Sequence, residues 1–241
     1  MQTSERIDQI THAFEEHAES AIVPPPVVRA RGRGFLVTAL IAFAGFIALM
    51  LAVRANPRRE RDVVATLRVQ RLTHPTLTGA MRFVSWFGFR PQSLLLPITA
   101  MTGTWLIGLR RESRYLFVAW IGSLVSWTTK RIVKRPRPSG DGIIVEVADL
   151  RDSSFPSGHT LHYVVFWGFF TYLCFTEIRN RWLRWLPVGW FGSLIALVGP
   201  SRIYLGHHWL TDVLGSYTLG TGYLATLIGL HRRNLSERVE R

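Results

Sequence analysis

The chain has 241 residues, a formal net charge of +13 and 48% hydrophobic residues. Its apolar residues come in blocks of membrane-spanning length rather than at amphipathic spacing, which disfavours a soluble fold and indicates an integral membrane protein. The basic residues lie mostly at the ends of these blocks, where membrane proteins keep their arginines, so the charge does not indicate a nucleic-acid partner. The single cysteine, Cys174, excludes an internal disulfide.

Residues 1–33 are predicted to form a separate N-terminal segment. Ile7, Ile10 and Phe14 begin an apolar series at helical spacing, which predicts a short amphipathic helix ending at the three prolines of residues 24–26. Acidic residues precede the first apolar block, and that block is too long for the core of a signal peptide. We therefore expect no cleaved signal.

Six apolar blocks follow, and each approaches the ~20 residues that a helix needs to cross a bilayer. We predict an all-α, integral-membrane bundle of six transmembrane helices over residues 34–231, followed by a basic tail at 232–241. The segment 54–91 interleaves apolar residues with arginines, which predicts helical structure along the membrane interface. The six predicted spans are 35–53, 92–109, 115–129, 159–176, 185–198 and 213–230.

Cations, histidines and one carboxylate are expected to gather on the membrane face opposite to both termini, because each crossing changes side. The third span ends there, the fourth begins, the fifth ends and the sixth begins. The N-terminus of a helix binds anions. Cations clustered around such an N-terminus would form a phosphate-binding pocket and would also stabilise the charge of a phosphoryl transition state. The residues of this face are Lys130, Arg137, Ser157, Gly158, His159, Arg202, His208 and Asp212.

His208 and Asp212 are four residues apart, hence one above the other if the sixth helix starts there. Asp212 could then accept the imidazole N–H and leave the other nitrogen free to attack phosphorus. His159 could protonate the departing alkoxide. His207 lacks the spacing to Asp212, and we expect a supporting or surface role for it.

Taken singly, these residues have ordinary explanations. Lys130 and Arg137 could be interfacial anchors, Asp212 a charge stabilised by a helix dipole, and His159 a packed histidine. Their common face and their order along the chain favour the catalytic interpretation.

Other polar residues nearby are given simpler roles. Lys134 and Arg135 are expected to steer anionic head groups, and His162 to pack within the fourth span. The loop acids, including Asp152, are expected to be solvated or to select head groups. A metal site is an alternative, with His207, His208, Asp212 and His159 as its ligands. Three cations in the same pocket would repel a divalent metal. We therefore predict no metal and no cofactor.

Three short motifs carry a resemblance to a known family. They are Lys130 with Arg137-Pro138, then Pro156-Ser157-Gly158-His159, then Ser201-Arg202 followed by His208 and Asp212. They resemble the signature of the type 2 phosphatidic acid phosphatase superfamily, which includes bacterial phosphatidylglycerophosphate and undecaprenyl diphosphate phosphatases.

The resemblance implies a helical bundle and a metal-independent mechanism, in which water hydrolyses a phosphohistidine formed on His208. It implies that His159 is the acid and Asp212 the orienting partner. By the same resemblance, the phosphoryl oxygens would be held by Lys130, Arg137, Ser157, Gly158 and Arg202.

We therefore expect a membrane lipid phosphatase that hydrolyses a phosphomonoester or a diphosphate of a lipid, namely phosphatidate, phosphatidylglycerophosphate or a polyprenyl diphosphate. A lipid phosphotransferase using the same site is an alternative, and so is a membrane transporter, although the charges lie at span ends rather than at mid-bilayer. The resemblance favours a multi-pass protein of the cell membrane with cytoplasmic termini and a site facing the periplasm or exterior. Head-group selection is expected from the segments 54–91 and 139–155.

Overall fold

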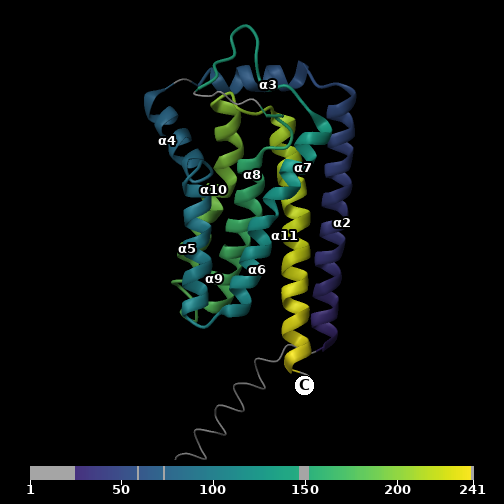
Figure 1. Ribbon diagram of the computed structural model, residues 1–241, viewed down its shortest axis with the longest axis vertical. Coiled ribbons are helices and arrows are strands. Elements are labelled where there is room, and N and C mark those ends of the chain that lie inside the picture. Colours follow the sequence, from purple (N-terminus) through teal and green to yellow (C-terminus); the bar gives the residue numbers. More distant parts are fainter. Residues whose placement is uncertain (1–24, 59, 73, 147–151, 240–241) are drawn as a thin grey trace, which may run out of the picture.

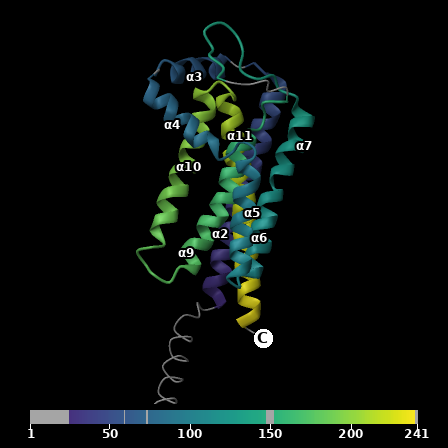
Figure 2. The ribbon, with the colours of Figure 1, turned by 60° about the vertical axis from the view of Figure 1, so that its left-hand side comes forward.

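A computed structural model describes residues 25–58, 60–72, 74–146 and 152–239, and every regular element among them is helical. The prediction of an all-α fold is therefore confirmed for this part of the chain. The long helices run side by side, and one short helix, α3 (Glu60–Gln70), lies across one end of the bundle (Figure 1 and Figure 2). We call this the α3 end. Most of the predicted N-terminal amphipathic segment lies outside the described residues.

Three helices are long and apolar enough to cross a bilayer. The first and the last of these three helices pack along one another. Gly222 of the last helix leaves room for the ring of Phe43 of the first, since a Cβ at residue 222 would lie 2.9 Å from that ring. The three helices are α2 (Pro25–Ala55), α10 (Trp185–Tyr204) and α11 (Leu210–Val239), and their spanning stretches are Arg33–Ala55, Trp185–Tyr204 and Leu210–Asn234.

The other three predicted spans are shorter or interrupted helices. The second is one helix of 15 residues, and the third is divided into two helices at Gly122. The fourth is a direct succession of two α-helices with one π-helical turn between them. Length and composition thus support three of the six predicted crossings. These helices are α5 (Gln92–Leu106), α6 (Arg110–Ile121), α7 (Ser123–Val133), α8 (Gly158–His162), the π-helix Tyr163–Trp167 and α9 (Gly168–Glu177).

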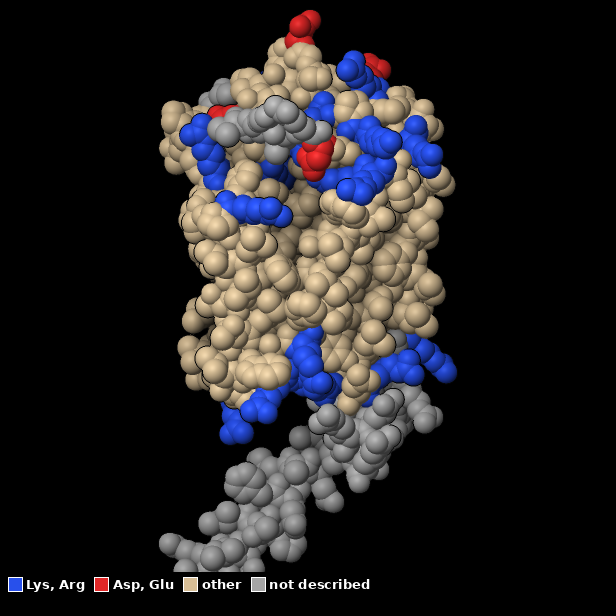
Figure 3. Space-filling view, viewed as in Figure 1, with Lys and Arg blue, Asp and Glu red and all other residues tan. Residues whose placement is uncertain are grey.

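Charged side chains lie near the two ends of the bundle. On the face drawn in Figure 3, Lys and Arg form two bands with a belt of uncharged residues between them. Large apolar side chains such as Leu40, Leu95 and Trp190 are exposed rather than buried. A surface of this kind suits hydrocarbon in the middle and lipid head groups at both edges.

The predicted interfacial segment forms α3 and α4 (Pro75–Trp86). The buried face of α3 is polar, since it consists of Asp62, Thr66 and Gln70. Gln70 donates to the carbonyl oxygens of Ile144 at 2.6 Å and Tyr204 at 3.0 Å. Specific polar contacts, rather than an apolar stripe, therefore hold α3 on the ends of the other helices.

The segment that leads into α8 is anchored in the apolar core. Phe155 is fully buried and stacks on Phe46 of α2, with ring centroids 5.8 Å apart. Gly215 of α11 makes room for this ring, because a Cβ there would lie 2.6 Å from it. The loop before Ser157 is thereby held against α2 and α11, which places the start of α8 close to the start of α11.

Candidate active site

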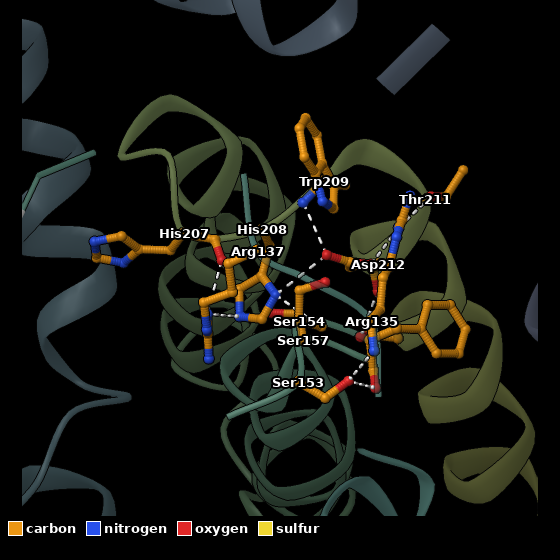
Figure 4. A network of polar contacts seen from close by, with 12 residues as sticks. Arg135, Arg137, Ser153, Ser154, Ser157, His207, His208, Trp209, Thr211 and Asp212 are labelled. Atoms are coloured by element: carbon orange, nitrogen blue, oxygen red, sulfur yellow. Dashed lines mark hydrogen bonds and ion pairs between the residues drawn. The ribbon is translucent and has the colours of Figure 1, made fainter. Parts of the chain in front are cut away.

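The predicted site residues meet at the α3 end of the bundle. They come from the last turn of α7, the start of α8, the last turn of α10, the start of α11 and the two intervening loops. Figure 4 shows His208 between Arg137 on one side and Asp212 on the other. Segments that are distant in sequence therefore lie within hydrogen-bonding reach of one another.

A tight turn presents His208 to the site. Gly206 has a φ of +72°, and a Cβ there would lie 2.2 Å from the carbonyl oxygen of Ile144, so glycine is required at this position. The backbone N–H groups of His207 and His208 then donate to the carbonyl oxygen of Arg202, at 3.0 and 3.2 Å. The turn folds back on the end of α10 and fixes the two histidines next to Arg202.

The imidazole of His208 is held in one orientation. Its Nδ1 lies 2.7 Å from the carbonyl oxygen of Ser154, and because a carbonyl only accepts, Nδ1 carries the proton. Nε2 is then the unprotonated nitrogen, and it accepts a long hydrogen bond from Nη1 of Arg137 at 3.5 Å. This is the tautomer that a nucleophilic histidine needs.

Asp212 is not the main hydrogen-bond partner of His208. Its Oδ2 is 3.5 Å from Nδ1 of His208 and accepts from the backbone N–H of Trp209 at 2.8 Å. The spacing predicts a direct hydrogen bond between the imidazole and the Asp212 carboxylate, but the structure shows the imidazole bound to the carbonyl oxygen of Ser154 instead. The reason is that α11 begins at Leu210, so His208 precedes the helix and the stacking of residues four apart does not apply.

The pKa of the His208 imidazole is held well below its ordinary value. Burial is the main cause, and the positive charges of Arg137, Arg202 and Lys130 act in the same direction. The ring is therefore neutral at neutral pH, and its Nε2 lone pair is available. The same cations that would bind an anion also keep the nucleophile unprotonated.

Lys130 and Arg137 share one anionic partner, the carboxylate of Asp152, to which both are ion-paired. Arg137 also donates to the carbonyl oxygen of His207 at 2.7 Å. Burial alone would raise the pKa of Asp152, but the hydrogen bonds and charges of the two cations outweigh it and lower that pKa to about 2. Asp152 is about half exposed, and its carboxylate occupies the place between the two cations where we expected a phosphate oxygen.

Arg202 is buried beneath the site in the last turn of α10. Its Nη1 lies 3.1 Å from the hydroxyl of Ser85, and its guanidinium carbon lies 5.2 Å from the centre of the Phe89 ring. Among the described residues, Nε of Arg202 and Nε2 of His159 are buried without a hydrogen-bond partner. Such orphaned polar atoms suit a site built for a ligand rich in hydrogen-bonding oxygens.

His159 lies in the first turn of α8 against Phe89, with ring centroids 4.6 Å apart. A Cβ at Gly88 would come within 2.2 Å of the His159 ring, so the ring position depends on glycine there. The hydroxyl of Ser157 accepts from the backbone N–H of Thr160 at 3.4 Å and therefore caps α8. Gly158 follows at the helix start, where backbone N–H groups have no partner within the helix.

The structure corrects the role expected for Arg135. This residue was expected to steer head groups from the surface, yet it is 2% exposed and ion-paired to Asp212 at 2.5 Å and to Asp62 at 2.6 Å. Its position beside the Arg137-Pro138 motif was a visible signal, but nothing in the sequence connects it with Asp62. Asp152, Ser154 and Phe89 were also missed as contacts of the site.

The remaining histidines next to the site, His162 and His207, are both buried. His162 is buried and stacks on Phe166 with ring centroids 5.5 Å apart, which confirms that it packs within the fourth predicted span. The ring of His207 points away from His208 (Figure 4), and its Nε2 contacts the carbonyl oxygen of Glu146. Within the described ranges, no three His, Cys, Asp or Glu side chains cluster as a metal site would require.

Comparison with known proteins places this arrangement in a family. Residues 111–236 match the sequence model of the PAP2 superfamily. The chain is 26% identical to phosphatidylglycerophosphatase B of Bacillus subtilis over 185 residues, covering 74% of this chain and 87% of that protein. It is 30% identical to a decaprenylphosphoryl-5-phosphoribose phosphatase of Mycobacterium tuberculosis over 194 residues, covering 78% of this chain and 100% of the relative.

The fold has a counterpart among solved structures. The crystal structure of a transmembrane PAP2 type phosphatidylglycerolphosphate phosphatase from Bacillus subtilis superposes with a TM-score of 0.72 at 22% identity. The match covers 81% of this chain and 96% of that one. The two proteins therefore share a fold.

Proposed function

The chain belongs to the PAP2 superfamily and is a membrane phosphatase, and from this premise we propose that it hydrolyses a lipid phosphomonoester or diphosphate through a phosphohistidine, without a metal. Phosphatidate, phosphatidylglycerophosphate and polyprenyl diphosphates are the candidate substrates. One observation carries the proposal: Nδ1 of His208 is bound to the Ser154 carbonyl at 2.7 Å, while Nε2 lies 3.5 Å from Arg137. A neutral nucleophile thus faces a cationic pocket.

The reaction proceeds in two displacements. Nε2 of His208 attacks phosphorus, the bond from phosphorus to the lipid oxygen breaks, and His159 gives a proton to the departing oxygen. In the second step His159 takes a proton from water, the water oxygen attacks phosphorus, and the bond from phosphorus to Nε2 breaks. Lys130, Arg137 and Arg202 stabilise the charge on the phosphoryl oxygens in both transition states.

We also propose the predicted topology of six crossings, with residues 34–231 as one phosphatase domain. In it, α6 and α7 together make one crossing, and α8, the π-helix and α9 make the next. Both the C-terminal end of α11 and the start of α2 lie at the end opposite to α3 (Figure 1), which supports an even number of crossings. Cytoplasmic termini would place the site at the outer face of the cell membrane.

Phosphate release from defined lipids tests the function. Purified protein in detergent or nanodiscs, with a chelator present, should release phosphate from at least one of phosphatidate, phosphatidylglycerophosphate and undecaprenyl diphosphate. Mass spectrometry of the lipid product distinguishes hydrolysis from transfer to an acceptor lipid. Absence of phosphate release from all three lipids, or release that depends on an added divalent metal, would contradict the proposal.

Replacing Asp152 by asparagine should strengthen binding of phosphate analogues. The amide keeps the size of the side chain but removes the charge that competes for Lys130 and Arg137, so orthovanadate should inhibit at a concentration lower by roughly threefold to tenfold. The measurement is the inhibition constant at fixed ionic strength. Asp141→Asn, which removes an exposed acid of the same loop, is the matched control and should leave it unchanged. Weaker or unaltered inhibition of Asp152→Asn would show that this carboxylate does not compete with the anion.

Replacing Gly88 by alanine should impair catalysis by moving His159. The added Cβ has no room beside the His159 ring, and displacement of a catalytic group by about 1 Å can cost roughly a hundredfold in rate. We expect a fall in kcat of about tenfold to a hundredfold with little change in melting temperature. Gly79→Ala on α4, where a Cβ meets nothing within 4 Å, is the control and should behave as the parent protein. Full activity of Gly88→Ala would mean that the position of His159 is not critical.

A further inference from the structure

Arg135 has every nitrogen of its guanidinium engaged by the protein. Nη1 donates to Asp212 Oδ1 at 2.5 Å and to the hydroxyl of Thr211 at 2.7 Å, while Nε donates to the carbonyl oxygen of Pro57 at 2.9 Å. Nη2 donates to Asp62 Oδ2 at 2.6 Å. Four of the five N–H donors are thus used, and because the side chain is fully buried it is not accessible to a lipid head group.

Asp62 connects this arginine with the interfacial helix. It lies in the first turn of α3, and its side chain is 1% exposed. Its Oδ1 accepts from the backbone N–H of Thr211 at 2.9 Å, and its Oδ2 accepts from the Thr211 hydroxyl at 2.7 Å. Asp62 therefore holds the start of α11 and Arg135 at the same time.

The arrangement gives the two oxygens of Asp212 different partners. Arg135 takes Oδ1, which leaves Oδ2 to the backbone N–H of Trp209 at 2.8 Å and to His208 at 3.5 Å (Figure 4). Two buried carboxylates thus share one buried guanidinium next to the nucleophile. Buried ion pairs contribute little net stability compared with well-packed apolar residues, so their contribution to stability does not account for this cluster.

We propose that Asp62 and Arg135 are positioning residues of the phosphatase reaction, acting through Asp212 on the imidazole of His208. The inference rests on the proposed function and deepens it. Arg135 fixes the rotamer and the charge of Asp212, and Asp62 fixes Arg135. The packing of α3 against the end of the bundle is thereby part of the catalytic arrangement. Neither Asp62 nor Arg135 contacts the substrate.

Asp62→Asn tests the inference, because it keeps the shape of the side chain and removes its charge. We expect kcat to fall roughly tenfold with KM unchanged, since the substrate is not contacted. In a protein that already carries Asp212→Asn, adding Asp62→Asn should not lower kcat further, because Asp62 acts on His208 only through Asp212. An undiminished effect in that background, or a fall explained entirely by a lower melting temperature, would overturn the inference.

Arg135→Lys is the second variant and is informative even if Asp62→Asn does not fold. Lysine keeps the positive charge, but its single ammonium group cannot bind Asp62 and Asp212 together as the planar guanidinium does. We therefore expect kcat to fall while KM stays constant. A higher KM with unchanged kcat would instead support the steering of head groups. Arg131→Gln, which removes an exposed cation lying over Trp127 one turn earlier, is the control and should leave both constants unchanged.

An observation independent of activity separates this inference from the proposed function. In protein labelled with ¹⁵N-histidine, Asp62→Asn should shift the ring nitrogen signals of His208, and Arg131→Gln should not. A shift in a protein that hydrolyses no lipid phosphate would show that Asp62 positions the imidazole of His208 and would contradict only the proposed function. Phosphatase activity with no change in kcat and no change in the His208 signals would remove the positioning role alone.

Discussion

Replacing His208 by alanine should reduce phosphate release by roughly a thousandfold or more, because the attacking nitrogen is lost while the cations that bind phosphate remain. The ring is buried and neutral, with its pKa lowered chiefly by burial and further by Arg137, Arg202 and Lys130, so the parent protein needs no base to activate it. Lipid binding should persist in the variant, since Lys130 and Arg137 are untouched. The measurement is kcat on the preferred lipid, with the melting temperature recorded for each protein.

His207→Ala is the matched control for this prediction. His207 adjoins His208 and is equally buried, yet its ring points away from the site and contacts the carbonyl of Glu146. We expect this variant to lose far less activity. Rapid quenching of the parent protein with labelled substrate should trap an acid-labile phosphoprotein that His208→Ala does not form. Equal losses in the two variants, or a phosphoprotein in His208→Ala, would contradict the assignment of the nucleophile.

Replacing His159 by asparagine should slow hydrolysis of lipid esters by roughly a hundredfold to ten-thousandfold, the size expected for loss of a general acid. The effect should depend on the leaving group, because an alkoxide needs a proton and a nitrophenolate does not. With p-nitrophenyl phosphate the loss in the first step should be much smaller, and a burst of nitrophenol should precede slow turnover. The two substrates are compared under the same conditions by pre-steady-state kinetics.

His162→Phe is the matched control for the role of His159. The residue lies one turn further along the same helix and stacks on Phe166, so phenylalanine preserves the packing and removes only the nitrogens. We expect near-parental rates on both substrates. If His159→Asn slowed the two substrates equally, its role would be in holding phosphate rather than in protonating the leaving group.

The contrast between Asp212 and Ser154 shows how local spacing can mislead. The spacing between His208 and Asp212 predicted a hydrogen bond on the assumption that both residues lie on one helix. The helix instead begins after His208, and the imidazole turns towards a backbone carbonyl 54 positions away in sequence. A carbonyl oxygen carries no residue-specific signal, so no inspection of side-chain types could identify this partner.

Asp152 and Arg135 show the same limit for charged residues. The sequence shows both as charges near the motifs, but it predicts only that Asp152 is solvated or selects head groups and that Arg135 steers them. Asp152 instead bridges Lys130 and Arg137, and Arg135 is buried between Asp62 and Asp212. Which cation pairs with which carboxylate depends on through-space distances between segments that are 73 positions apart for Arg135 and Asp62.

The fold class, the membrane location, the family and the residues of the three motifs could all be predicted from the sequence. These follow from the lengths and the order of the apolar blocks and from three motifs with defined spacing, all of which can be read along the chain. The three-dimensional arrangement was needed to learn which atom orients His208, what lies between Lys130 and Arg137, and how α3 is joined to the site. Those features depend on contacts between distant segments, and a one-dimensional pattern of residue types does not encode the distances that select them.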